Sequence, residues 1–169
     1  MKRAKWRPDF IVAALAVMIG LLTMIVYIYQ ARVMSRQLHA SVWPYLEVVF
    51  SQGEAGLAIY VINKGVGPAM VRQNEILVDG VRWTEDTIDS LLVSMVGRPI
   101  NRTFTTVQGS VVMAGEKIPF LLVPTPADAV ALDSAFRHHR LEMRLCYCSI
   151  YDDCWRTDNG RVQPCDDCQ

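Results

Sequence analysis

The sequence has no charged residue and no proline between Phe10 and Tyr29, and it has no cysteine before position 146. It also lacks the Gly-x-Ser-x-Gly elbow of the α/β-hydrolases, the His-Glu-x-x-His pair of zinc proteases and the loops of protein kinases. Serines, histidines and aspartates are present, but no pattern in the sequence places them together. Catalysis is therefore the less favoured class, and we expect a protein that is not an enzyme.

The uncharged run has the length of a membrane span. At about 1.5 Å of rise per residue, residues 10–29 cover the ~30 Å hydrocarbon layer as a helix, which satisfies its own backbone polar groups. A cleaved signal peptide has a shorter apolar core that ends at a small-x-small site, and no clean Ala-x-Ala follows here. We predict an uncleaved signal anchor: a basic segment over 1–9, a transmembrane helix over 10–29 and a helical stalk over 30–42.

Basic residues flank the run unequally: Lys2, Arg3, Lys5 and Arg7 precede it, whereas Arg32 and Arg36 follow it. The positive-inside rule then predicts a cytoplasmic N-terminus. We expect the protein in a bacterial inner (plasma) membrane, with its C-terminal domain in the periplasm or outside the cell.

The part of the chain beyond the stalk is acidic. From Ser41 onwards it contains sixteen acidic and eleven basic residues, a net charge of about −5. Nucleic acids and anionic membrane surfaces attract clustered Lys and Arg, so this charge argues against both as ligands of the head. The partners expected are the lipid bilayer around the helix and either another protein or a second copy of the chain, with no cofactor.

Short apolar runs separated by turns predict a mainly-β head over residues 43–157, followed by a Cys/Asp-rich tail over 158–169. The predicted strands are Tyr45–Ser51, Leu57–Ile62, Ala69–Val78, Thr103–Met113, Lys117–Val123 and Leu141–Ile150. Two short helices are predicted, one after Thr84 and one after Thr125. This pattern favours an antiparallel immunoglobulin-like sandwich with two short helices, and an α+β domain is the alternative.

Turn chemistry separates these elements. Asp79-Gly80 between apolar residues predicts a two-residue hairpin loop, and further turns are expected at Gln52–Gly56 and Asp158–Gly160. The segment Asn63-Lys64-Gly65-Val66-Gly67-Pro68 lacks the Gly-Lys-Ser/Thr of a phosphate-binding loop. We interpret Asn63, Gly65, Gly67 and Pro68 as a structural turn, in which the glycines supply φ values that other residues avoid.

All five cysteines lie near the C-terminus: Cys146, Cys148, Cys154, Cys165 and Cys168. Outside the cytoplasm they favour disulfides. Cys146 and Cys148 share one face of a strand and should each find another partner. The preferred first bridge is Cys148–Cys154, across a turn, and the preferred second joins Cys146 to Cys165 or Cys168. One thiol is left over, free or joined to another chain.

Two chemical alternatives compete with structural bridges. Cys165 and Cys168 have the spacing of a thiol-redox pair, but the aspartates between them raise the thiol pKa. A zinc or copper site with His138 or His139 lacks the paired Cys-x-x-Cys units of a zinc knuckle. We interpret these histidines as charges at a helix C-terminus and predict no metal site.

Three motifs together resemble a group of bacterial membrane-anchored proteins with no assigned activity. The motifs are Val42-Trp43-Pro44-Tyr45, Asn63-x-Gly65-x-Gly67-Pro68-Ala69 and Tyr147-Cys148-Ser149-x-Tyr151-x-x-Cys154-Trp155. The resemblance implies an extracytoplasmic β-rich head and carries over no catalytic residue. Cys146, Cys165 and Cys168 are not part of the group's pattern. The function expected is that of a non-enzymatic, membrane-anchored interaction or accessory protein, and the alternative is a thiol-redox or metal-handling protein that uses the cysteine cluster.

Overall fold

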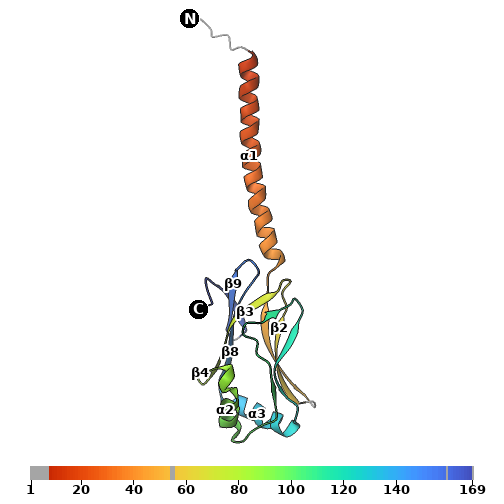
Figure 1. Cartoon of the computed structure of the whole chain (residues 1–169), viewed down its shortest axis with the longest axis vertical. Coiled ribbons are helices and arrows are strands. Elements are labelled where there is room, and N and C mark those ends of the chain that lie inside the picture. Colours follow the sequence, from red (N-terminus) through yellow and green to blue (C-terminus); the bar gives the residue numbers. More distant parts are fainter. Residues whose placement is uncertain (1–7, 54–55, 159, 169) are drawn as a thin grey trace. The chain divides into compact units, whose positions relative to one another are not determined.

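A computed structural model describes residues 8–53, 56–158 and 160–168 of the 169-residue chain (Figure 1). The chain forms two compact units, Met1–Ala40 and Ser41–Gln169, and each is considered by itself. Three predicted features lie wholly or partly outside the described residues: the basic segment that includes Lys2, Arg3, Lys5 and Arg7, the centre of the turn at 54–55, and Asn159 in the last turn.

The described part of the first unit is one helix. Helix α1 (Pro8–Ser41) has 34 residues, none of them buried. It runs through both the predicted span and the predicted stalk. At about 1.5 Å per residue, a helix of this length is roughly 50 Å long, more than the ~30 Å that a bilayer core requires. By length and composition, α1 is the one helix among the described residues that could cross a membrane.

The second unit, the head, contains two antiparallel sheets (Figure 1). In order across the first sheet lie β1 (Leu46–Gly53), β2 (Gly56–Asn63), β7 (Lys117–Val123) and β5 (Thr103–Phe104). In order across the second lie β10 (Arg161–Cys165), β9 (Cys154–Asp158), β8 (Leu141–Cys148), β3 (Ala69–Val78) and β4 (Val81–Trp83), and β6 (Val111–Val112) pairs with β3. The mainly-β, antiparallel head is confirmed.

Three helical segments connect the strands: the 3-10 turn η1 (Glu85–Thr87), α2 (Ile88–Val96) and α3 (Pro126–His138). Helix α2 ends at Gly97, whose φ of 78° is the left-handed conformation typical of a helix C-terminus. Thr125 precedes α3 but makes no side-chain capping bond, although threonine is a common residue at that position. Figure 1 shows α2 and α3 together at one end of the head.

The two sheets share one apolar core. Val61 and Leu121 from the first sheet and Val71 and Leu145 from the second are all 2% exposed or less and belong to the same cluster. Tyr147 is also fully buried, and its hydroxyl accepts a hydrogen bond of 3.2 Å from the backbone N–H of Leu46. This bond ties the first residue of β1 to the opposite sheet, which fixes where the chain enters the head.

Two strand predictions were wrong. Thr103–Met113 is not one strand: β5 pairs with β7 in the first sheet, whereas β6 pairs with β3 in the second. Between them Val107 is fully buried and Gly109 donates a backbone hydrogen bond to Val71, so the chain crosses from one sheet to the other. The predicted tail also contains a strand, because residues Arg161–Cys165 form β10 along β9.

Candidate functional site

The cysteines gather on the outer face of the six-stranded sheet. In β8 side chains alternate between faces, so that Leu145 and Tyr147 enter the core while Cys146 and Cys148 point the other way. Outward-facing residues of a sheet are ordinarily exposed, yet Cys146 and Cys148 are each only 3% exposed. The C-terminal segment that is bonded to Cys146 through Cys168 helps to cover them.

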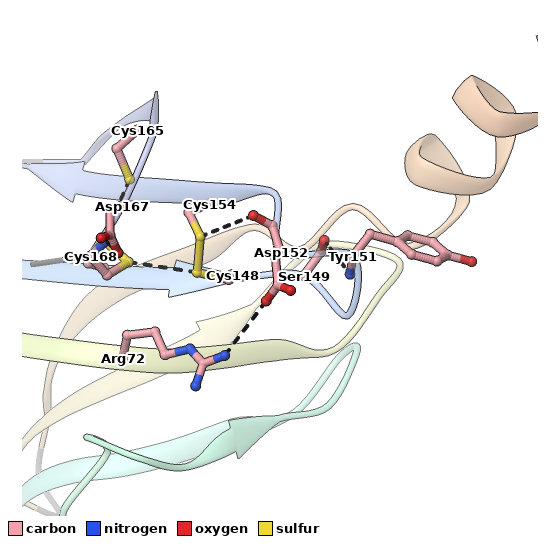
Figure 2. Close-up of a disulfide and its surroundings, with 10 residues drawn as sticks. Arg72, Cys148, Ser149, Tyr151, Asp152, Cys154, Cys165, Asp167 and Cys168 are labelled. Carbon is pink, nitrogen blue, oxygen red and sulfur yellow. Dashed lines mark hydrogen bonds and ion pairs between the residues drawn. A yellow bond between two sulfur atoms is a disulfide. The ribbon is translucent and has the colours of Figure 1, made fainter. Parts of the chain in front are cut away.

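The strand register aligns three of the cysteines. Cys148 on β8 lies opposite Cys154 on β9, and Cys154 in turn lies opposite Cys165 on β10. Cys148 and Cys154 are joined by a disulfide, with their Cα atoms 4.0 Å apart (Figure 2). This is the pair that the sequence analysis preferred, and it closes the hairpin between β8 and β9.

A second disulfide joins Cys146 to Cys168, with Cα atoms 5.5 Å apart. Cys168 is one of the two partners, Cys165 and Cys168, that the sequence left open for Cys146. Cys165 remains a half-buried thiol. Its Sγ lies 3.5 Å from Sγ of Cys146, and because Cys146 is oxidised, Cys165 can only be the donor in this contact.

The five sulfur atoms form one continuous cluster. Sγ of Cys168 lies 3.8 Å from Sγ of Cys148, which links the two disulfides (Figure 2). Two groups of three sulfurs, Cys146/Cys165/Cys168 and Cys148/Cys154/Cys168, each lie within 4.8 Å of one another. Four of the five are held in bridges, so the cluster could offer thiolates to a soft cation such as Zn²⁺ only after reduction.

Cys165 is a poor thiolate. Burial raises its pKa, and the carboxylates of Asp166 and Asp167 raise it further, while the nearby guanidinium of Arg156 lowers it in part. In low-pKa redox cysteines a cation or a helix N-terminus dominates, whereas here the effect of Arg156 is outweighed by burial and the two aspartates. The direction of the shift agrees with the sequence analysis, but burial rather than the aspartates is the leading cause. Cys165 and Cys168 are not bonded to each other.

The histidines lie apart from the cysteines. Nδ1 of His139 lies 2.6 Å from Oδ2 of Asp79, in the turn between β3 and β4, and Oδ1 of Asp79 accepts a hydrogen bond from the backbone of Arg140. These bonds lower the pKa of Asp79, the hydrogen bond from His139 contributing most. Among the described residues, no sulfur cluster with metal-binding spacing includes His138 or His139.

Asn63 is the centre of the predicted structural turn. It is fully buried, and its side chain makes four hydrogen bonds. Oδ1 accepts from the backbone N–H groups of Tyr45 and Gly65, at 3.2 and 2.9 Å. Nδ2 donates to the carbonyls of Gly67 and Val112, at 2.8 and 3.0 Å. One side chain therefore fastens the chain entry, the 64–68 loop and β6 together.

The glycines of this turn are required for a different reason from the one predicted. Neither Gly65 nor Gly67 has a positive φ. A Cβ on Gly65 would lie 2.5 Å from the backbone nitrogen of Tyr45, and one on Gly67 would overlap the carbonyl oxygen of Val42. The loop packs directly on the backbone of residues 42–45, where Trp43 accepts hydrogen bonds from the N–H groups at 66 and 67. Close approach explains both glycines.

Five exposed apolar side chains lie on segments that hydrogen bonds or strand pairing connect to this turn, and we call them the loop-end patch. They belong to the chain entry, the 64–68 loop, the β6 region and the β8–β9 turn. Met70 at the start of β3 pairs with both Val111 and Cys148, which brings the last two segments together. The members and their exposures are Trp43 (43%), Val66 (65%), Val111 (52%), Met113 (58%) and Ile150 (52%). No local pattern in the sequence marks this patch, because its members are far apart in the chain.

A polar pocket of about 480 Å³ lies at the β3–β4 edge. Asn74, Trp83 and Glu85 line it, with Gln73 and Gln108 among the remaining residues. Oε1 of Glu85 accepts hydrogen bonds from Nδ2 of Asn74, at 3.0 Å, and from the backbone N–H at 107, at 3.4 Å. Glu85 therefore holds the 105–109 segment against β3, and this structural role explains its placement.

Comparisons with protein-family models, with curated proteins and with solved structures returned no match to this chain.

Proposed function

We propose that the protein is a single-pass membrane protein whose head, an immunoglobulin-like sandwich on the extracytoplasmic side, binds another membrane protein. The loop-end patch is the observation that carries this proposal. Contiguous exposed apolar side chains mark interaction surfaces, whereas single exposed ones are ordinary. The patch combines exposed side chains from four segments that are separate in the sequence and are linked by the hydrogen bonds of Asn63 and the strand pairings of Met70.

Rigidity supports the same proposal. A loop that must be ordered on binding costs affinity, so a preorganised surface binds more tightly for the same area. Asn63 holds three of the four patch segments through its bonds to Tyr45, Gly67 and Val112. The motif around Asn63 is then explained as the frame that presents Trp43, Val66 and the β6 residues in fixed positions.

Charge favours a protein over a lipid surface as the occupant. The head carries about −5, which disfavours approach to anionic headgroups. An anchor such as α1 would confine the head to the membrane plane, where it meets the extracytoplasmic parts of other membrane proteins. The partner that fits is a membrane protein with an apolar contact surface and a basic rim.

Photo-crosslinking tests this interface in intact membranes. A benzophenone amino acid is placed at Val66, in the patch, or at Val130 on α3; the two valines are 65% and 64% exposed. We expect an adduct with another protein from position 66 and none from position 130. Equal labelling from both positions, or none from either, would refute the proposal. An adduct with a second copy of the chain would show that the patch is an interface between copies of this chain and not a site for a different protein.

Membrane insertion and orientation need their own test. The chain should stay in the membrane pellet after alkaline carbonate extraction. A C-terminal alkaline phosphatase fusion, which is active only outside the cytoplasm, should be active, and a C-terminal fluorescent protein that folds only in the cytoplasm should be dark. The opposite pair of results would place the head in the cytoplasm and reverse the proposed orientation.

The thiol-redox or metal-handling alternative has one observation in its favour, the contact between all five sulfurs. It predicts that Cys165→Ser abolishes an activity or a bound metal while the fold is kept. The interaction proposal predicts that the same variant still crosslinks from position 66. Measuring both properties on the Cys165→Ser variant therefore distinguishes the two functions.

A further inference from the structure

The odd thiol is placed against a disulfide instead of away from it. Sγ of Cys165 lies 3.5 Å from Sγ of Cys146 and within 4.8 Å of Sγ of Cys168, so it touches the bridge between these two residues. A buried structural bridge is ordinarily protected from exchange because no thiol can reach it. Here the chain itself supplies that thiol.

We propose that Cys165 and the Cys146–Cys168 bridge form an internal thiol–disulfide exchange site. Cys165 loses its proton to solvent, and its thiolate attacks Sγ of Cys146. A Cys146–Cys165 bond forms, the Cys146–Cys168 bond breaks, and its electron pair leaves on Cys168, which takes up a proton. One disulfide and one thiol are present before and after, so the step needs no oxidant or reductant.

Cys165 lies beside the bridge but is not yet placed to attack it. Its sulfur is close to both atoms of the bridge, whereas displacement needs the thiolate in line with the bond. Cys165 is the last residue of β10, and β9 lies between β10 and Cys146 on β8. The Cα atoms of a disulfide are usually within about 7 Å, and strands two apart in a sheet are roughly 9–10 Å apart, so the exchange requires the end of β10 to move toward β8.

Electrostatics set the rate. Groups from three segments lie near the Cys165 thiol. Strand β8 contributes Cys146, and β9 contributes Arg156 and Cys154. The C-terminal segment contributes Asp166 and Asp167. The pKa of Cys165 is raised, so the thiol form dominates at neutral pH. The attacking species is the thiolate, so the rate should rise about tenfold per pH unit until the pH reaches the pKa of Cys165.

Exchange changes where the chain offers a reactive thiol. In the second isomer Cys165 is bridged, and the thiol is on Cys168 near the end of the chain. Sγ of Cys168 lies 3.8 Å from Cys148, so the same chemistry can pass the thiol on to Cys154. The C-terminal segment beyond position 165 is untethered in the second isomer, where its thiol becomes a site for a mixed disulfide with a partner's disulfide.

The test maps disulfides in the full chain, in membranes, without reducing agent. Samples held at pH 6.5, 7.5 and 8.5 are quenched in acid, alkylated while acidic, digested and analysed by mass spectrometry. We expect both isomers, with the alkyl group on Cys165 in one and on Cys168 in the other. Cys165→Ser should give the Cys146–Cys168 bridge alone.

Cys168→Ser tests whether Cys165 can reach Cys146, which is the geometric requirement of the exchange. When an oxidising extracytoplasmic environment acts on this variant during folding, its two thiols should be oxidised to a Cys146–Cys165 bridge, and the wild-type circular dichroism spectrum should be kept. The double variant Cys148→Ser/Cys154→Ser removes the other bridge without leaving a thiol beside Cys168; it serves as the matched control and should leave both isomers of the Cys146 bridge. A single wild-type isomer at every pH, or reduced Cys146 and Cys165 in a folded Cys168→Ser variant, would overturn the proposal. Five free thiols with bound zinc would do the same.

Discussion

Asn63→Ala should be among the most damaging single substitutions in the head. The alanine removes four hydrogen bonds at a position with no exposed surface. It leaves the N–H groups of Tyr45 and Gly65 and the carbonyls of Gly67 and Val112 without their partner. Each buried neutral hydrogen bond contributes about 1 kcal/mol, and each orphaned group costs about 1–3 kcal/mol.

The summed loss is about 4 kcal/mol, taking the lower value for each bond because water can enter the space that the side chain leaves. That is a large share of the roughly 5–15 kcal/mol by which domains are stable. With a urea m-value of about 1.5 kcal/mol per molar, the unfolding midpoint should fall by about 2–3 M. Urea titration of the detergent-solubilised chain, followed by tryptophan fluorescence, measures it.

Asn101→Ala is the matched control. Asn101 is exposed, and its hydrogen bond to Asp128 comes from the backbone rather than the side chain. Its midpoint should not change measurably. Asn63→Asp keeps the acceptor oxygen but loses both donor bonds and places a charge beside two carbonyls, so it should be at least as unstable as Asn63→Ala. A midpoint within about 0.5 M of wild type for Asn63→Ala would refute the assigned role of this side chain.

Three further outcomes follow from the same structure. Gly67→Ala should destabilise the head by more than about 2 kcal/mol in urea titration, because its Cβ overlaps the Val42 carbonyl, whereas Gly53→Ala meets no atom within 4 Å and serves as control. Asp79 has a lowered pKa in the folded state, so its carboxylate stabilises the fold above about pH 4, and this stabilisation is lost as the pH falls through the pKa of the folded state. Asp79→Asn should therefore make the free energy of unfolding depend less on pH in that acidic range. Tyr147→Phe leaves the backbone N–H of Leu46, at the start of β1, without its acceptor, and it should lower the free energy of unfolding, measured by thermal unfolding, by about 1–2 kcal/mol.

Local chemistry explains the parts of the fold that could be predicted. Asp79-Gly80 forms the expected hairpin loop with both residues at positive φ, because that turn depends on two adjacent positions. Ala69–Val78 has the bounds predicted for it, since apolar and β-branched residues there favour an extended strand. Gly97 ends α2 in the left-handed conformation that glycine favours. Each of these features depends on residues that are close in sequence.

The two failures in strand assignment are long-range. The segment 103–113 reads as a single strand, but its two ends belong to different sheets, and only the buried position of Val107 shows the crossing. The strand β10 was hidden by its proline and cysteine and by the aspartates on either side of it, which are typical of an irregular tail. It forms because β9 supplies an edge with free backbone hydrogen-bonding groups.

The sequence by itself determined that the chain has one helix able to cross a membrane and an acidic, mainly antiparallel β head with its cysteines at one end. These properties follow from composition and from periodicity along the chain. Only the tertiary structure decided why Gly65 and Gly67 are glycines, which distant side chains form the loop-end patch, and that Cys165 lies against the Cys146–Cys168 bridge. Each of these depends on the distance between segments that the chain brings together only when the two sheets pack, and no local pattern encodes that distance.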